Sequence, residues 1–190
     1  ESRMLVREKS TDDATIDTYG IRGLRRWLSI LTGNNLTFLG GNSLLNHPWV
    51  KEADIVHLHN THGYYFHLPI LKRLTAEKKV VWTLHDMWTM TAHCGSSRSE
   101  TPNENGFYSC PAQFEYEPIF LPRTRWLEQT KKKILSGLPI RFVTPSLWLK
   151  NTCSASHLKD RTVQVIPNAG KDIIFRNTKE KKDAIRTALG

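Results

Sequence analysis

VVWTLH, residues 80–85, is the stretch that decides the fold, together with DIVHLH (54–59) and RFVTP (141–145). Each run is almost continuously apolar and β-rich, which is typical of strands that are buried on both faces of a parallel sheet. Helical patterns separate these runs, and such alternation indicates βαβ units. The sequence therefore predicts an α/β fold, a Rossmann-like parallel sheet flanked by helices. The predicted strands are 3–7, 36–39, 54–59, 79–85, 141–144 and 162–166, and the predicted helices are 21–31, 64–75, 125–135, 146–152 and 179–189.

Length and composition suit one globular domain with a hydrophobic core. The chain has 190 residues, 39% of them hydrophobic and 24% charged, and a domain of this size buries roughly 70% of its unfolded surface. It opens in ESRMLVRE (1–8), which has the pattern of a strand already under way, so we expect a fragment cut at both ends. The turn PNAG (167–170) predicts a domain boundary. Residues 1–170 then form the domain, and residues 171–190 form a linker and the first helix of a following domain.

The cysteine count bears on the cellular compartment. Three cysteines, Cys94, Cys110 and Cys153, do not suggest a disulfide framework in a domain of this size. We therefore expect reduced thiols and a cytosolic location. No apolar run approaches the length of about 20 residues that a membrane span requires. The sequence carries no P-loop and no GxGxxG motif, and we expect no cofactor.

The chain is strongly basic. Its formal net charge is +9, from 27 Lys and Arg against 18 Asp and Glu, a balance that favours nucleic acid, anionic lipid or phosphate-bearing substrates. Two predicted helices, 21–31 and 123–135, carry apolar residues on one face and basic residues on the other. We expect the apolar stripes to pack on the sheet and the surplus charge to face an anionic membrane surface. The predicted membrane contacts are Arg22, Arg25, Arg26, Arg123, Arg125, Lys131, Lys132 and Lys133.

Polar residues gather where two predicted strands end. His57, His59 and Asn60 close one strand, and His85 and Asp86 close the next. Ligands of open parallel sheets bind beyond the carboxyl ends of the strands, so this rim is the predicted site. A structural alternative stays open for each histidine, namely a hydrogen bond to a backbone carbonyl.

Two sets of residues could suggest zinc, but neither has suitable spacing. In His57, His59 and His62 the third residue lies in a loop rather than on the strand. The set His93, Cys94 and Cys110 lacks an evident fourth ligand. We therefore expect no metal site.

A long connection follows the second of these strand ends. Residues 91–118 are polar and aperiodic, with prolines and glycine breaking any regular element. A connection of this length within a compact domain predicts either a functional lid or a disordered segment.

Five motifs, taken in order along the chain, resemble one protein family. They are ADIVHLHN (53–60), VVWTLHDMWTMTAHC (80–94), SCP (109–111), VTPSLWLK (143–150) and VQVIPNAGKDIIF (163–175). As a set they are similar to the N-terminal domain of family 4 glycosyltransferases, retaining enzymes with two Rossmann-like domains (the GT-B fold). The resemblance covers most of the chain and points to a subgroup that acts in bacterial exopolysaccharide, capsule or O-antigen assembly.

The resemblance implies a sugar-transferring enzyme. A nucleotide-sugar donor would bind mainly to a second domain, and this domain would bind a saccharide or lipid-linked acceptor. It also implies that no metal and no protein nucleophile is needed. With the basic helices, it predicts a cytoplasmic protein, peripheral at the inner face of the membrane.

The resemblance also implies roles for individual residues. His85 matches the histidine that contacts the transferred sugar near its reacting carbon, where a polar group stabilises an oxocarbenium-like transition state. Asp86 either contacts the acceptor or fixes its loop, Ser146 is a natural helix N-cap, and Asn168 is a hinge or turn residue. The residues expected to contact substrate besides His85 are His59, Asn60, Asp86, Trp88, Ser146 and Asn168.

Two rival classes of function remain. The first is a basic nucleic-acid-binding α/β module, which requires basic and aromatic residues interleaved on one surface. The aromatic residues here lie mostly in apolar runs, so we expect no nucleic-acid partner. The second is a metal-binding or sensor domain built on the histidines and cysteines, which elemental analysis would test.

Overall fold

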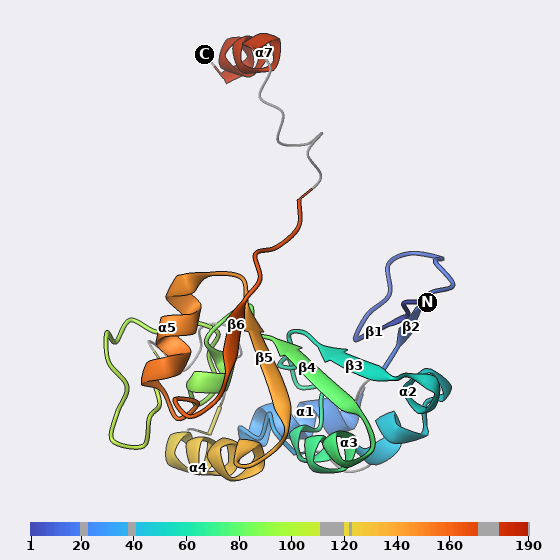
Figure 1. Ribbon diagram of the computed structural model, residues 1–190, viewed down its shortest axis with the longest axis vertical. Helices are drawn as coiled ribbons and strands as arrows, with labels where there is room; N and C mark the ends of the chain where they lie inside the picture. The colour runs from blue at the N-terminus through green and yellow to red at the C-terminus, as the bar shows by residue number, and fades with distance from the viewer. Residues whose placement is uncertain (20–22, 38–40, 111–119, 122, 171–178, 190) are drawn as a thin grey trace.

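A parallel sheet of four strands forms the centre of the domain (Figure 1). The computed structural model describes residues 1–19, 23–37, 41–110, 120–121, 123–170 and 179–189. The strand order is β3-β4-β5-β6, and each neighbouring pair is parallel. This arrangement confirms the predicted α/β fold, a parallel sheet flanked by helices. The strands are β3 (Ile55–Leu58), β4 (Lys79–Thr83), β5 (Ile140–Thr144) and β6 (Val163–Val165).

A second, two-stranded parallel sheet lies near the N-terminus. β1 (Met4–Val6) pairs with β2 (Ile16–Thr18). The sequence predicts β1 but not β2, because three residues with a central aspartate show no clear strand pattern. The strand predicted at 36–39 falls partly outside the described residues, and its first two residues are not in a strand. Leu36 is nevertheless fully buried, which accounts for the apolar signal there.

Helices join the strands and cover the sheet. α3 packs against β4 and contacts α4, while α5 packs against β5 and β6. The helix predicted at 64–75 begins later than expected, because a 3-10 turn containing Pro69 precedes it and proline has no N–H to donate. The helices and 3-10 turns are α1 (Leu24–Thr32), η1 (Gly41–Asn46), α2 (Pro48–Glu52), η2 (Leu68–Ile70), α3 (Leu71–Glu77), η3 (Trp88–Met90), α4 (Thr124–Leu135), α5 (Leu147–Ala155) and α7 (Lys179–Leu189).

Aromatic and leucine side chains form the core between the sheet, α3 and α4. Trp82 of β4 and Phe142 of β5 are almost fully buried, and their ring centroids lie 5.9 Å apart. Leu71 and Leu74 of α3 and Leu127 of α4 belong to the same buried cluster. Full burial of side chains of this kind contributes roughly 1.5–3 kcal/mol each. This core fixes the strand ends on which the site is built.

α1 departs from the expectation for an amphipathic helix on a sheet. Its apolar side chains Leu24, Trp27, Leu28 and Leu31, here called the α1 stripe, are between 49% and 74% exposed. The prediction that this stripe packs on the sheet is therefore wrong. The helix buries Ser29 instead. Helical periodicity specifies one apolar face but does not specify what covers that face.

The chain leaves the sheet after β6 (Figure 1). Residues 166–170 are exposed and without regular structure, and every described side chain of α7 is exposed. The helix predicted at 179–189 is confirmed, whereas the assignment of residues 171–190 to a linker and a following domain stays a prediction. Within the described ranges, every helix is too short or too polar to cross a membrane.

Candidate functional site

The carboxyl ends of β3 and β4 bring the predicted site residues together. Because the two strands are parallel neighbours, the residues that follow them emerge at the same edge of the sheet. His59 and Asn60 follow β3, while His85 and Asp86 follow β4. Residues 26 positions apart in sequence thereby come into contact at this edge.

Three histidines form a connected group there. Nδ1 of His59 lies 2.8 Å from Nε2 of His85, and Nε2 of His57 lies 2.8 Å from the hydroxyl of Thr83. The ring centroids of His57 and His59 are 4.1 Å apart. Burial lowers the pKa of His59, and the nearby His57 and His85 lower it further; burial and His85 also lower the pKa of His57. His57 and His59 are therefore neutral at pH 7, and each carries one nitrogen that can accept a hydrogen bond.

Asn60 turns the chain from β3 into the following loop. Its backbone has φ of 25°, in the left-handed region that asparagine adopts more readily than most residues. The hydroxyl of Tyr65 donates to the carbonyl oxygen of Asn60 at 2.8 Å and holds this turn. The turn returns the chain so that His62 reaches Asp86.

Asp86 is held by two partners. Its Oδ1 accepts the backbone N–H of Trp88 at 2.8 Å, and its Oδ2 lies 2.7 Å from Nε2 of His62. The His62 side chain is 6% exposed and the Asp86 side chain is 29% exposed. The loop-fixing role that the sequence offered for Asp86 is thus present, and the carboxylate remains partly exposed.

A pocket of about 460 Å³ opens at this edge, within the usual range for small-molecule sites. Among the residues predicted to contact substrate, Asn60, His85 and Asp86 line it. From the sequence, His62 and Cys94 were considered only as poor zinc ligands. Gly95 and Ser96 were missed, because they lie in the long polar connection. The full lining is Asn60, His62, His85, Asp86, Cys94, Gly95 and Ser96.

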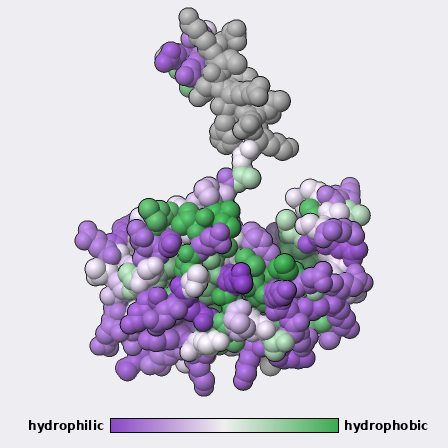
Figure 2. All heavy atoms as spheres, in the orientation of Figure 1, coloured by the Kyte–Doolittle hydropathy of each residue, from purple (hydrophilic) through white to green (hydrophobic). Residues whose placement is uncertain are grey.

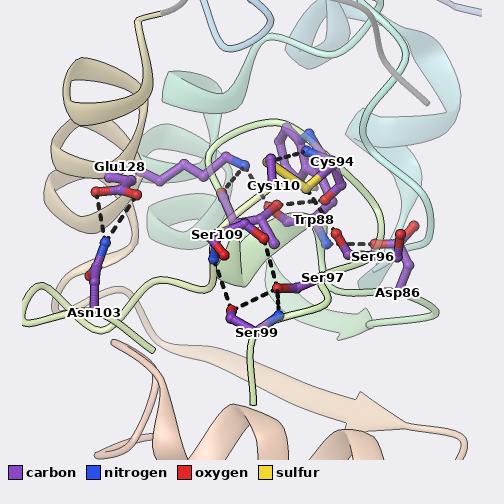
Figure 3. The surroundings of a disulfide bond; sticks show 12 residues. Asp86, Trp88, Cys94, Ser96, Ser97, Ser99, Asn103, Ser109, Cys110 and Glu128 are labelled. Carbon is purple, nitrogen blue, oxygen red and sulfur yellow. Dashed lines mark hydrogen bonds between the residues drawn. A yellow bond between two sulfur atoms is a disulfide. The ribbon is translucent and has the colours of Figure 1, made fainter. Parts of the chain in front are cut away.

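A disulfide forms part of the pocket wall, because Cys94 lines the pocket. Figure 3 shows the surroundings of this disulfide. Cys94 and Cys110 are bonded, with Cα atoms 5.7 Å apart, so the prediction of reduced thiols is wrong for this pair. The cysteine count therefore no longer argues for a cytosolic location. The backbone N–H of Met87 donates to the carbonyl of Gly95 at 2.9 Å, which ties the wall to the turn after β4. The free thiol, Cys153, is buried, and burial raises its pKa to about 12.

The first part of the predicted lid is an ordered wall. Thr91 forms a β-bridge with Tyr108, and the N–H of Tyr108 donates to the carbonyl of Met90 at 2.8 Å. The hydroxyl of Ser97 donates to the carbonyl of Ser109 at 2.7 Å (Figure 3). The disordered alternative is therefore wrong for residues 91–110, and residues 111–119 lie outside the described residues.

Lys131 lies behind the site and not on the surface. Its side chain is fully buried, and its Nζ donates to the carbonyls of Trp88 at 2.5 Å and Thr91 at 2.9 Å. The same ammonium lies 3.7 Å from the centroid of the Trp88 ring. A buried charge requires such partners, so the prediction that Lys131 contacts a membrane is wrong. Lys131 instead fixes η3 beneath the pocket.

Other predicted contacts lie away from the pocket lining. Ser146 accepts the N–H of Leu149 at 3.3 Å, which confirms it as the N-cap of α5. Asn168 is exposed beyond β6, and Trp88 is buried against Lys131. His59 reaches the site through His85. Substrate contacts by these four residues stay predictions.

The side chains that suggested zinc are engaged with one another or with other groups. His57 pairs with Thr83, His62 pairs with Asp86, and Cys94 and Cys110 share a disulfide. Among the described residues, no group of three or more His, Cys, Asp or Glu side chains is arranged to hold a metal ion.

Comparison with known proteins points to one reaction class. The chain is 28% identical over 102 residues to a protein of Escherichia coli (strain K12) named "Putative colanic acid biosynthesis glycosyl transferase WcaC". The matched region covers 48% of this chain and 25% of that relative, so the chain spans about a quarter of the relative's length. No protein-family model and no solved structure matches the chain. The similarity supports the resemblance to glycosyltransferases at this general level.

Proposed function

We propose that this chain is the acceptor-side domain of a retaining glycosyltransferase of the GT-B type, active in bacterial surface-polysaccharide synthesis. The pocket at the carboxyl edge of the parallel sheet carries the proposal, because His85, Asp86 and Asn60 offer hydrogen-bonding groups suited to sugar hydroxyls. The similarity to a named glycosyl transferase supports the same reaction class. The substrates are a nucleotide-sugar donor and a saccharide acceptor carried on a lipid.

His85 contacts the transferred sugar in this proposal. The hydrogen bond between Nδ1 of His59 and Nε2 of His85 orients the His85 ring and leaves Nδ1 of His85 to reach a sugar hydroxyl. The acceptor hydroxyl attacks the anomeric carbon on the face from which the diphosphate departs, and a phosphate oxygen takes its proton. The protein therefore supplies positioning and electrostatic stabilisation, without a nucleophile or a metal ion.

An apolar surface near the same edge suits closure by a second domain. Leu147 and Trp148 at the start of α5 and Ile166 after β6 are 49% to 64% exposed. The N–H of Ile166 donates to the carbonyl of Thr144 at 2.9 Å, which places it beside the end of β5. Figure 2 shows apolar surface gathered over the start of α5 in this region. A donor-binding domain that covered this surface would exclude water from the transfer site.

The reaction is tested by comparing this chain with the complete polypeptide that carries it. We expect the complete polypeptide to release nucleoside diphosphate from UDP-glucose, UDP-galactose or GDP-mannose when a lipid extract containing acceptors is present. The 190-residue chain should transfer no sugar and bind these nucleotides weakly, since the diphosphate contacts belong to the second domain. Calorimetric binding of a nucleotide-sugar by the chain with a dissociation constant in the low micromolar range, about 8 kcal/mol, would contradict the assignment of donor binding to the second domain.

The same enzyme is proposed to sit at the inner face of the cytoplasmic membrane. At the start of α4, Phe120, Leu121 and Trp126 are exposed beside Arg123 and Arg125. The Arg123 guanidinium lies 6.0 Å from the centroid of the Trp126 ring. Aromatic, apolar and basic side chains in this combination suit the boundary between lipid headgroups and acyl chains. We propose further membrane contacts by the exposed Lys132 and Lys133 and by the α1 stripe. Arg22 and the side chains of Arg25 and Arg26, also predicted as membrane contacts, lie outside the described residues.

Vesicle cosedimentation tests the membrane proposal. Replacing both Arg123 and Arg125 by alanine should weaken binding to anionic vesicles by about 2 kcal/mol, or roughly 30-fold. Binding of the unaltered chain should rise with anionic lipid and fall with salt. Replacing the exposed Lys51 and Lys79 provides a control with the same loss of charge. Equal binding to neutral vesicles contradicts the proposal, and preferential binding to duplex DNA in competition would favour the nucleic-acid alternative.

A further inference from the structure

The described lining of the pocket lacks the lysine and arginine side chains that make the chain basic. The formal net charge of the chain is +9, yet the described residues that line the pocket include one carboxylate, that of Asp86, and no lysine or arginine. Lys131 is buried beneath η3, where it donates to backbone carbonyls. The ligand of this pocket therefore has no lysine or arginine among the described lining residues to contact.

The carboxylate is presented in a fixed orientation. One oxygen accepts the N–H of Trp88 and the other is paired with Nε2 of His62, at 2.8 Å and 2.7 Å. An ionised carboxylate can only accept hydrogen bonds, so His62 carries its proton on Nε2 in this contact. His62 is almost completely buried, whereas part of Asp86 remains open to the pocket. Each carboxylate oxygen has two lone pairs, so acceptor capacity remains for a ligand.

We propose that this pocket binds the ring of an uncharged sugar, whose hydroxyls donate to Asp86, and that it rejects uronic acids and phosphorylated sugars. His62 is the positioning residue that holds Asp86 in this role. The inference rests on the proposed function and deepens it, because it assigns the chemical class of the sugar that binds at the transfer site. A second carboxylate or a phosphate in the pocket would face the Asp86 carboxylate with no lysine or arginine in the described lining to offset the repulsion between like charges.

The remaining lining complements a sugar ring. Asn60 offers an amide that both donates and accepts, and Ser96 offers a hydroxyl. The left-handed turn at Asn60 fixes the backbone of that residue, and the disulfide at Cys94 fixes the segment that carries Ser96. A volume of about 460 Å³ accommodates a single pyranose with bridging water.

The test uses nuclear magnetic resonance of the isotopically labelled chain. The probes are methyl β-D-glucopyranoside, methyl β-D-galactopyranoside and methyl β-D-glucuronide, so two are neutral and one adds a carboxylate to the same ring. We expect the neutral glycosides to shift the amide signals of Asn60, Gly95 and Ser96 with millimolar affinity. We expect the glucuronide to bind at least about tenfold more weakly.

Three substitutions identify the groups responsible. Asp86→Asn should weaken the binding of neutral glycosides and abolish the discrimination against the glucuronide. His62→Leu should lower the affinity for neutral glycosides. His62→Gln, which keeps an N–H donor, should retain part of the affinity that His62→Leu loses. Asp160→Asn removes an exposed carboxylate outside the pocket and should change neither affinity. Thermal melting of each variant shows whether the fold survives, and the rescue by glutamine separates positioning from a purely structural role.

Several results overturn the inference. They are equal or tighter binding of the glucuronide, absence of binding by either neutral glycoside up to its solubility limit, and retention of discrimination in Asp86→Asn. Failure of the proposed function looks different. If neutral glycosides bind as expected but the complete polypeptide transfers no sugar, the pocket assignment stands and the transferase assignment falls. If transfer occurs and Asp86→Asn leaves the use of neutral and charged sugars unchanged, the transferase assignment stands and the pocket assignment falls.

Discussion

Replacing His85 by alanine in the complete polypeptide should lower turnover by a factor of about 10² to 10³ while leaving the fold intact. His85 lines the pocket and is held by His59 at 2.8 Å, so its ring is oriented before substrate arrives. A hydrogen bond that strengthens in the transition state lowers the barrier, and losing one such oriented group costs about 3–4 kcal/mol. Turnover and melting temperature, measured on the same preparation, test this expectation.

His57→Ala provides the matched comparison. His57 pairs with Thr83 and does not line the pocket, so its loss should mainly reduce stability or acceptor affinity. If His85 were only a structural residue, His85→Ala would lower the melting temperature while the remaining folded protein kept near-normal turnover. A stable and fully active His85→Ala enzyme would contradict both roles.

Reducing the Cys94–Cys110 disulfide should destabilise the chain by about 3 kcal/mol, because the bond closes a loop with a sequence separation of 16 residues. For a chain of this size, that loss corresponds to a fall in melting temperature of about 6–12 °C. Denaturant unfolding with and without dithiothreitol measures the difference. In the folded chain Cys153 should not take part in thiol exchange, since burial raises the pKa of its thiol to about 12 and keeps it protonated.

The double substitution Cys94→Ser, Cys110→Ser is the control for reductant effects. Its stability should match that of the reduced chain and should not change when dithiothreitol is added. Three titratable thiols in the untreated, unfolded protein, together with an unfolding midpoint that reductant does not move, would show that the disulfide does not form. The same thiol count on protein isolated directly from cells reports the redox state of its compartment.

Local pattern in the sequence was sufficient for the main elements of the fold. Continuous apolar runs predicted β4 and β5, and helical spacing predicted α4 and α7. It was also sufficient to place His85 and Asp86 at the carboxyl edge, because the end of a parallel strand can be recognised from neighbouring residues. These features depend on residues within one element, and their signal therefore lies in one stretch of sequence.

Tertiary structure alone decided which residues meet. Lys131 belongs to a basic run, yet it is buried against carbonyls 40 and 43 residues earlier in the chain. Cys94 meets Cys110 because the bridge between Thr91 and Tyr108 brings the two segments together. Composition gives no indication of such a pairing when the cysteines are few.

Local sequence pattern also failed to predict the contacts within the site and the exposure of the α1 stripe. The pairing of His62 with Asp86 crosses two loops and 24 residues, so no spacing rule reveals it. The α1 stripe has ideal amphipathic periodicity, but whether an apolar face is covered depends on the neighbouring elements. The sequence by itself thus determined the elements and the edge at which the site forms, whereas long-range contacts determined the pocket wall, the orientation of Asp86 and the exposed faces.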